Sequence, residues 1–329
     1  MVRRFAMKYC LLGAVILLFC SCRHKDLWLG SGRSATVNIA FDWSAATERE
    51  QGTIVDVWLF ERDDAVSPIL EQKPEVGGPL LVPFGSYRAL AYNADSGTLR
   101  MKGEESWETL YLYTRDESIL APLGLVTKID LRAAGAAGER VVLSPEKVWS
   151  GRLTDMRVRL TDEDQSFVIG MRNAFMRLNI AVRGIENYES LSGVSFAISG
   201  LAEGYYVGED RLSHEPVTIP FEGWKTKSKS YAPDGDEECA GTVLFFGHCP
   251  DGVTYRHFLN IYAVMSDGQK LMYTYDVTEQ MHDPSNRSDD GTQISIVIDG
   301  LPLPTTVGDS GLLHNTVDEW ASEEIEIRA

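Results

Sequence analysis

The sequence of 329 residues is short of basic side chains, with 31 Lys and Arg against 48 Asp and Glu, so its formal net charge is −17 at pH 7. Nucleic-acid binding depends on Lys and Arg that neutralise phosphates, and this balance argues against a nucleic-acid partner. It also argues against a broad electrostatic attraction to anionic lipid headgroups. Any hold on a membrane therefore has to rest on something other than surface charge.

Cysteine is scarce as well, with five residues in the chain. Three of them lie within the first 22 residues, which leaves Cys239 and Cys249 in the body of the chain. Residues 242–246 between these two predict one buried strand, and the ends of such a strand lie roughly 30 Å apart. Because a disulfide needs Cα atoms within about 7 Å of each other, we expect two free thiols.

Long apolar runs are absent except at the N-terminus, where residues 9–19 follow the basic residues Arg3, Arg4 and Lys8. This run is too short to cross a bilayer, which takes about 20 residues at helical rise. A basic head, a short apolar run and the small residue Ser21 are instead typical of a cleaved export signal. No later stretch is apolar enough to predict a spanning helix.

Cys22 directly follows Ser21, which is the arrangement of a bacterial lipoprotein signal, in which the cysteine is acylated and becomes the new N-terminus. The match is loose at Cys20, where a small residue is commoner. The alternative is a plain signal peptide cut nearby, with Cys22 incidental. Each buried acyl methylene adds about 0.8 kcal/mol of membrane affinity, and several chains give stable anchoring. We therefore expect a signal peptide over residues 1–21, lipid on Cys22 and a tether over residues 22–32.

Helical periodicity is also scarce, and residues 278–281 predict only one short turn. Apolar residues instead occupy alternate positions, as in residues 36–43 and 175–182, which is typical of half-buried strands. Residues 53–60 are apolar on nearly both faces. Many short strands divided by Gly and Pro turns predict an all-β fold of sandwich type. Further strands are expected at residues 79–83, 87–93, 99–102, 110–114, 140–143, 194–198, 205–207, 242–246, 258–265, 270–277 and 292–298.

The length that remains after the signal fits about two domains. The polar run at residues 161–166 marks a change of character along the chain. We predict an N-terminal sandwich over residues 33–153, a C-terminal sandwich over residues 154–304 and a C-terminal tail over residues 305–329. The tail is expected to fold back on the second sandwich, with Trp320 as its buried anchor.

Motifs of catalysis are missing: the chain has no Gly-x-Ser-x-Gly elbow and no phosphate-binding glycine loop. Among six histidines, the nearest grouping of candidate metal ligands is Cys239, His248, Cys249 and His257, and it straddles a strand. Structural zinc prefers ligands two to four residues apart, so we expect His257 to be an ordinary strand-edge residue. The acidic run at residues 234–238 lacks the spacing of a calcium loop. We therefore expect no enzyme, no cofactor and no metal.

Aromatic residues are plentiful, with seven Trp and thirteen Tyr. Large rings in sandwiches are usually core or sheet face, but they can also form a sugar-binding platform. The candidates for such a platform are Trp107, Trp224, Tyr205 and Tyr206. A surface protein that binds a glycan or another ligand is therefore the alternative function.

The lipoprotein signal and several short motifs resemble Bacteroidota lipoproteins related to the fimbrillin-associated anchor proteins (minor-fimbrium-anchor type), many of which have no known role. The motifs lie at residues 37–43, 83–87, 178–180, 184–187, 294–300 and 317–320. The resemblance covers most of the mature chain. It implies two tandem transthyretin-like β-sandwich domains and, for characterised members, anchoring or assembly of surface fimbriae.

On this basis we expect a non-enzymatic lipoprotein of the cell outer membrane, held by lipid on Cys22 and exposed at the surface. It would anchor or help to assemble a fimbria-like polymer, so that fimbrial subunits are the expected partners.

Overall fold

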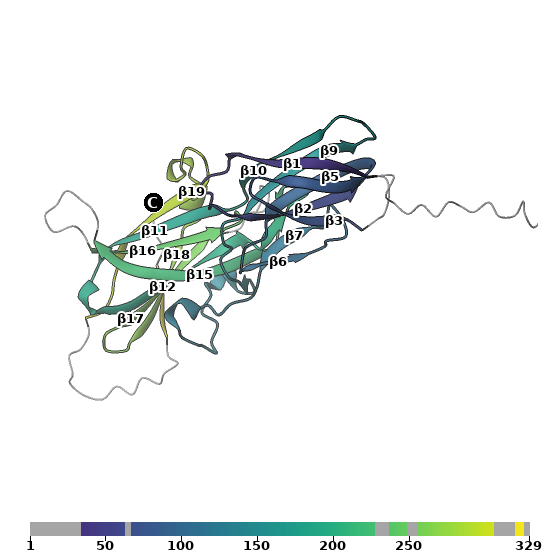
Figure 1. Cartoon of the computed structure of the whole chain (residues 1–329). Helices are drawn as coiled ribbons and strands as arrows, with labels where there is room; N and C mark the ends of the chain where they lie inside the picture. The colour runs from purple at the N-terminus through teal and green to yellow at the C-terminus, as the bar shows by residue number, and fades with distance from the viewer. Residues whose placement is uncertain (1–33, 63–66, 228–236, 249–255, 306–319, 326–329) are drawn as a thin grey trace, which may run out of the picture.

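The computed structural model describes residues 34–62, 67–227, 237–248, 256–305 and 320–325. The predicted signal, the tether and Cys22 lie outside these residues, as do Cys249 and most of the predicted tail. Strands are the dominant secondary structure of the described chain, and they lie in an elongated body (Figure 1). The all-β, sandwich-like fold predicted from alternation is confirmed.

The first large sheet has seven strands in the order β3-β2-β5-β9-β10-β1-β4. Their bounds are β1 (Ser34–Ala45), β2 (Ile54–Glu61), β3 (Ile69–Pro74), β4 (Gly78–Pro83), β5 (Gly85–Asn93), β9 (Trp149–Val158) and β10 (Gln165–Asn173). The outermost strands β3 and β4 follow each other in the chain, so the sheet curls until its two edges approach each other. Its alternate apolar residues, such as Val37 and Ile39 of β1, point into the enclosed core.

The position of β2 in the structure explains why its sequence is apolar on both faces. Val55, Val57 and Leu59 face the core inside the curled sheet. Trp58 and Phe60 face the opposite way, into a second cluster of buried residues. Because both faces of β2 are buried, a second layer of the protein must cover the outer face of this sheet.

That cover is a small sheet of four strands in the order β14-β13-β7-β6. Its strands are β6 (Leu99–Lys102), β7 (Tyr111–Thr114), β13 (Gly204–Tyr206) and β14 (Arg211–Leu212). The first pair comes from the N-terminal half of the chain and the second pair from the C-terminal half. Pairing of β7 with β13 therefore joins the two halves through a shared sheet.

The second large sheet runs β19-β11-β16-β15-β12-β17-β18-β20, with β8 paired to β15. Its strands are β8 (Arg140–Val141), β11 (Met176–Ile185), β12 (Leu191–Ala202), β15 (Pro216–Lys227), β16 (Glu237–Phe245), β17 (Phe258–Met265), β18 (Lys270–Asp276), β19 (Gln293–Leu301) and β20 (Ala321–Ile325). The largest hydrophobic cluster of the protein lies within it.

Helices are few and short among the described residues. They are α2 (Thr278–His282) and the 3-10 turns η2 (Ala121–Leu123), η3 (Ala134–Ala136), η4 (Tyr188–Ser190) and η5 (Pro284–Asn286). The helix α2 coincides with the single helical turn expected from the sequence. None of the described helices is long and apolar enough to cross a membrane.

The predicted division at residues 153/154 does not follow the sheets. It falls inside β9, and β10 also belongs to the first sheet, where it pairs with β1 in parallel. The polar run at residues 161–166 covers part of the turn after β9 and the first two residues of β10, and it is not a linker. The chain leaves the first sheet only after Asn173, because pairing between distant strands, which alternation does not reveal, decides where a sheet ends.

The predicted return of the tail is seen in part. Strand β20 pairs in parallel with β18, and the Trp320 ring packs edge-on to Tyr262 with ring centroids 5.7 Å apart. Trp320 is half-buried, so it is a less enclosed anchor than we expected.

Candidate functional site

The four aromatic residues predicted as a sugar platform do not share one surface. Trp107 and Tyr205 are only 5% and 6% exposed and belong to the core between the first sheet and the small sheet. Trp224, on β15, is 47% exposed, and Tyr206 is half-buried on β13. Two of the four rings are therefore structural, and the arrangement does not favour the glycan-binding alternative.

Tyr206 belongs instead to a group of rings on the small sheet that the sequence did not single out. Its ring centroid lies 4.5 Å from that of Tyr111, which is 5.9 Å from that of Tyr113. The Lys102 ammonium lies 4.6 Å from the Tyr111 centroid, and the Arg211 guanidinium lies 3.7 Å from that of Tyr206. Tyr111 is 1% exposed, and the two cations lie over the rings, so the group stabilises the small sheet.

A partly buried polar contact fixes the small sheet to the first large sheet. Asp210, in the turn between β13 and β14, accepts a hydrogen bond from the Tyr205 hydroxyl at 2.6 Å. The same carboxylate pairs with Arg152 of β9 at 2.6 Å and with Arg172 of β10. Burial would raise the pKa of Asp210, but these hydrogen bonds and positive charges outweigh it and hold the pKa below the usual value. Asp210 is therefore ionised at neutral pH and connects three strands.

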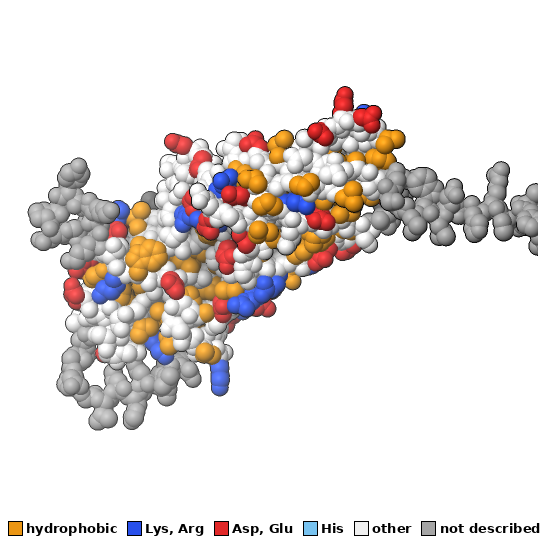
Figure 2. Space-filling view, in the orientation of Figure 1, with side chains coloured by type: hydrophobic (Ala, Val, Ile, Leu, Met, Phe, Trp, Pro, Cys, Tyr) orange, Lys and Arg blue, Asp and Glu red, His pale blue; other side chains and the backbone are white. Residues whose placement is uncertain are grey.

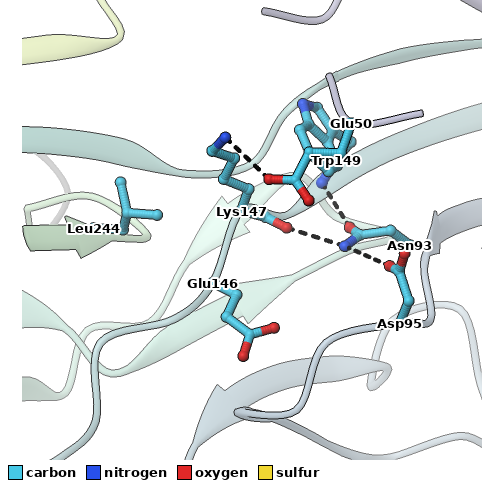
Figure 3. A pocket seen from close by; sticks show the side chains of 7 residues that line it. All are labelled: Glu50, Asn93, Asp95, Glu146, Lys147, Trp149 and Leu244. Atoms are coloured by element: carbon cyan, nitrogen blue, oxygen red, sulfur yellow. Dashed lines mark hydrogen bonds and ion pairs between the residues drawn. The ribbon is translucent and has the colours of Figure 1, made fainter. Parts of the chain in front are cut away.

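A hollow of about 320 Å³ lies where the first sheet meets the second (Figure 3). It is lined by Glu50, Asn93, Asp95, Glu146, Lys147, Trp149 and Leu244. Lys147 reaches Glu50 at 3.1 Å, and Asn93 accepts from the Trp149 backbone at 2.8 Å while it donates to the Lys147 carbonyl at 3.0 Å. Lys147 with Glu50 and Asn93 with Asp95 thus bind each other across the hollow, while the Glu146 carboxylate accepts from the Gly97 backbone.

The strand edges of the first sheet are protected against pairing with another chain. Edge strand β3 carries Lys73 and Pro74, and edge strand β4 carries Pro79 and Pro83. Proline cannot donate to a ladder, and charged residues on an edge disfavour an added strand. Leu81 of β4 is exposed. On the face of the molecule that Figure 2 shows, apolar side chains are interrupted by charged ones.

Strand β19, at one edge of the second sheet, is less protected, with Asp299 as its single charged residue. It pairs with β11 on one side, and on its far side the described residues offer only one isolated bridge, between Arg287 and Ile294. Its sequence Gln-Ile-Ser-Ile-Val-Ile-Asp-Gly-Leu contains no Pro and no Lys or Arg. The opposite edge of the same sheet is occupied by β20. An open edge of this kind can accept an added strand.

The histidines are arranged differently from what the sequence suggested. His257 was expected at a strand edge, but it is only 1% exposed, so that expectation is wrong. It lies with His248 and His282, and His282 was missed because it comes from α2, far along the chain. Cys239 is a free thiol in the core, and burial raises its pKa to about 11.

The chain matches one family model and is similar to a protein named for fimbrium anchoring. Residues 21–222 match the family model described as "Domain of unknown function (DUF5119)". A Bacteroides ovatus protein named "Putative fimbrium anchoring subunit Fim4B" is 24% identical over 218 residues, which are 65% of this chain and 60% of that protein. This chain thus spans less than two thirds of that relative, while the resemblance to fimbrial-anchor-like proteins is confirmed.

Solved structures share the fold. The crystal structure of a "putative adhesin" from Bacteroides ovatus matches with a TM-score of 0.60 and 19% identity, covering 87% of this chain and 98% of that one. A "putative adhesin" from Bacteroides thetaiotaomicron matches with a TM-score of 0.50 and 11% identity, covering 81% and 91%. At these identities the likeness concerns the fold alone.

Proposed function

The chain belongs to the family described as Domain of unknown function (DUF5119), and from that premise we propose that it is a non-enzymatic surface lipoprotein that anchors or helps to assemble a fimbria-like polymer. The observation that carries the proposal is its similarity to a protein named as a fimbrium anchoring subunit. The Ser21-Cys22 signal supports the lipid anchor. Acylation of Cys22 would hold the body on the outer membrane without a spanning helix.

An anchor protein must hold its partner through its own surface. Among the edge strands described above, β19 has the edge that is most open to an added strand. Ile294, Ile296 and Ile298 point into the core and fix the register of β19 against β11. The backbone on its outer side can then pair with a strand of a fimbrial subunit. The neighbouring exposed side chain Val297, 36% exposed, would lie beside the added strand.

The lipid anchor is tested by Cys22→Ser. This variant should lose acyl labelling and move from the membrane fraction to the soluble fraction, while a Cys249→Ser control stays with the membrane. Unchanged fractionation of Cys22→Ser would refute the anchor.

Partner binding is tested by placing a charge on the open edge. Val297→Lys should reduce co-purification of the fimbrial subunit by about tenfold or more, since Lys on an edge strand disfavours pairing. The matched control is Leu81→Lys on the protected strand β4, where Leu81 is 68% exposed. Equal recovery of the subunit with both variants would exclude β19 as the docking edge.

A further inference from the structure

His248, His257 and His282 come from three separate parts of the second sheet and meet at one point. His248 follows β16, His257 precedes β17, and His282 ends α2. One ring nitrogen of each lies within 4.8 Å of the others. Their ring centroids are 4.9 Å apart for His248 and His282, 5.2 Å for His257 and His282, and 6.0 Å for His248 and His257.

We infer that these three histidines bind a divalent transition-metal ion of the class that prefers imidazole, with zinc as the first candidate. Imidazole nitrogen suits zinc, copper and nickel, whereas calcium and magnesium take oxygen ligands. Three histidines with an open fourth position form one of the recurrent zinc arrangements. The inference is independent of the fimbrial proposal.

His257 is already oriented as a ligand. Its Nδ1 lies 3.0 Å from the Ser199 carbonyl, which can only accept, so Nδ1 carries the proton and Nε2 keeps its lone pair. Metal-binding histidines commonly donate their other nitrogen to a carbonyl in this way. A Cβ on Gly200 would come within 2.8 Å of that Nδ1, so a glycine is needed beside the ring.

The three histidine nitrogens must move closer together before they can bind one zinc ion. Zinc–nitrogen bonds of about 2.0–2.1 Å place tetrahedral ligands about 3.4 Å from one another. His257 is buried and His248 half-buried, so His282, which is exposed, is the side chain with freedom to move inward. The backbone of α2 is held beside the cluster, because Asn286 of η5 donates to the Gln280 carbonyl of α2 at 3.0 Å.

Two charged groups face the cluster. The Arg287 guanidinium donates to His248 Nε2 at 2.7 Å, so it must withdraw, or His248 must bind through its other nitrogen. Asp276 lies near His257 and is paired with Arg256. Arg287 therefore competes with a cation for this site, and its removal should favour metal binding.

The test uses the untagged mature chain, freed of metal by a chelator and titrated with zinc chloride by calorimetry and thermal unfolding. We expect one zinc per chain and a raised melting temperature, since a ligand of the folded state stabilises it. His282→Ala should weaken binding by at least about tenfold, a loss at least as large as that from removing an outer partner of a ligand. The matched control His214→Ala, at an exposed histidine outside the cluster, should bind as the parent does.

A second variant tests whether the metal binds at this cluster, and it leaves the buried His257 ring unchanged. Arg287→Gln removes the competing charge and should bind zinc severalfold more tightly. Zinc binding that is unchanged in His282→Ala, or unchanged or weaker in Arg287→Gln, would overturn the inference. So would the absence of binding to the parent chain.

Discussion

The Asp210 carboxylate lies 2.6 Å from the guanidinium of Arg152, and this contact joins the C-terminal half of the chain to the first large sheet. Asp210 belongs to the β13–β14 hairpin, whereas Arg152 belongs to β9. Together with Tyr205 and Arg172, the pair holds the small sheet over the outer face of β2 and β5. The two halves of the chain are thus interlocked by a polar contact as well as by strand pairing.

Replacing Asp210 with Ala should lower the free energy of unfolding by about 1–3 kcal/mol, since it leaves Arg152 and the buried Tyr205 hydroxyl without their acceptor. The pKa of Asp210 lies below its usual value of 3.8, so its contribution to stability is present above that pH and is lost as the pH falls through the lowered pKa. Urea unfolding at pH 7 and at acid pH should therefore show a difference that shrinks below pH 3.8.

The control for this variant is Asp155→Ala, which removes an exposed pair with Arg157. Exposed pairs contribute little, so its stability should stay close to that of the parent. An equal loss in both variants would mean that Asp210 does not join the sheets.

Gly204→Ala should destabilise the small sheet. A Cβ at this position would lie 2.2 Å from the Leu112 carbonyl oxygen and 2.6 Å from the Tyr111 ring, so β13 could not stay paired with β7. Such overpacking typically costs about 1–3 kcal/mol in the free energy of unfolding. Gly170→Ala on β10, where a Cβ meets no atom within 4 Å, is the matched control. Equal melting temperatures of the two variants would contradict this packing.

Trp320→Ala tests whether β20 belongs to this body. The ring packs edge-on to Tyr262 and is half-buried, so its removal should lower the free energy of unfolding by about 1–2 kcal/mol. Trp224→Ala, at a ring exposed on β15, should change it little. If Trp320→Ala keeps its stability but loses co-assembly with a partner, the segment is a partner-binding element and not part of this fold.

Cys239 should resist thiol reagents in the folded protein. It is wholly buried, and burial raises its pKa to about 11, so little thiolate forms at pH 8. The measurement is labelling of a chain that begins at residue 23 and carries Cys249→Ser, so that Cys239 is its single thiol. Labelling should be slow in buffer and fast in urea; fast labelling in buffer would show that the thiol is accessible.

Alternation in the sequence located most strands but none of their partners. Residues 36–43 lie within β1 and residues 176–182 lie within β11, because one buried face imposes a period of two. Residues 258–265 coincide with β17, which is apolar along nearly its whole length. The parallel pairing of β1 with β10 joins residues more than a hundred positions apart, and a local pattern carries no information about it. The predicted boundary at residues 153/154 falls inside β9 for this reason.

The candidate sites show the same limit. Trp107 and Tyr205 are large and aromatic in sequence, and only the covering small sheet makes them core residues. His248 and His257 are visible as neighbours along the chain, but His282 joins them only because α2 folds back beside β17. The protected edges β3 and β4, by contrast, could be recognised from their prolines and charges once the strands were assigned.

The most direct test of the account is photo-crosslinking on intact cells, with a photoreactive residue at position 297 on β19 or at position 81 on β4. We predict a crosslink from position 297 to a β-rich fimbrial subunit in the membrane fraction, which is lost when Cys22→Ser releases the protein. Position 81 should give none. No crosslinked subunit at position 297, or equal crosslinking from position 81, would contradict the proposal that this chain holds a fimbrial polymer through the open edge of its second sheet.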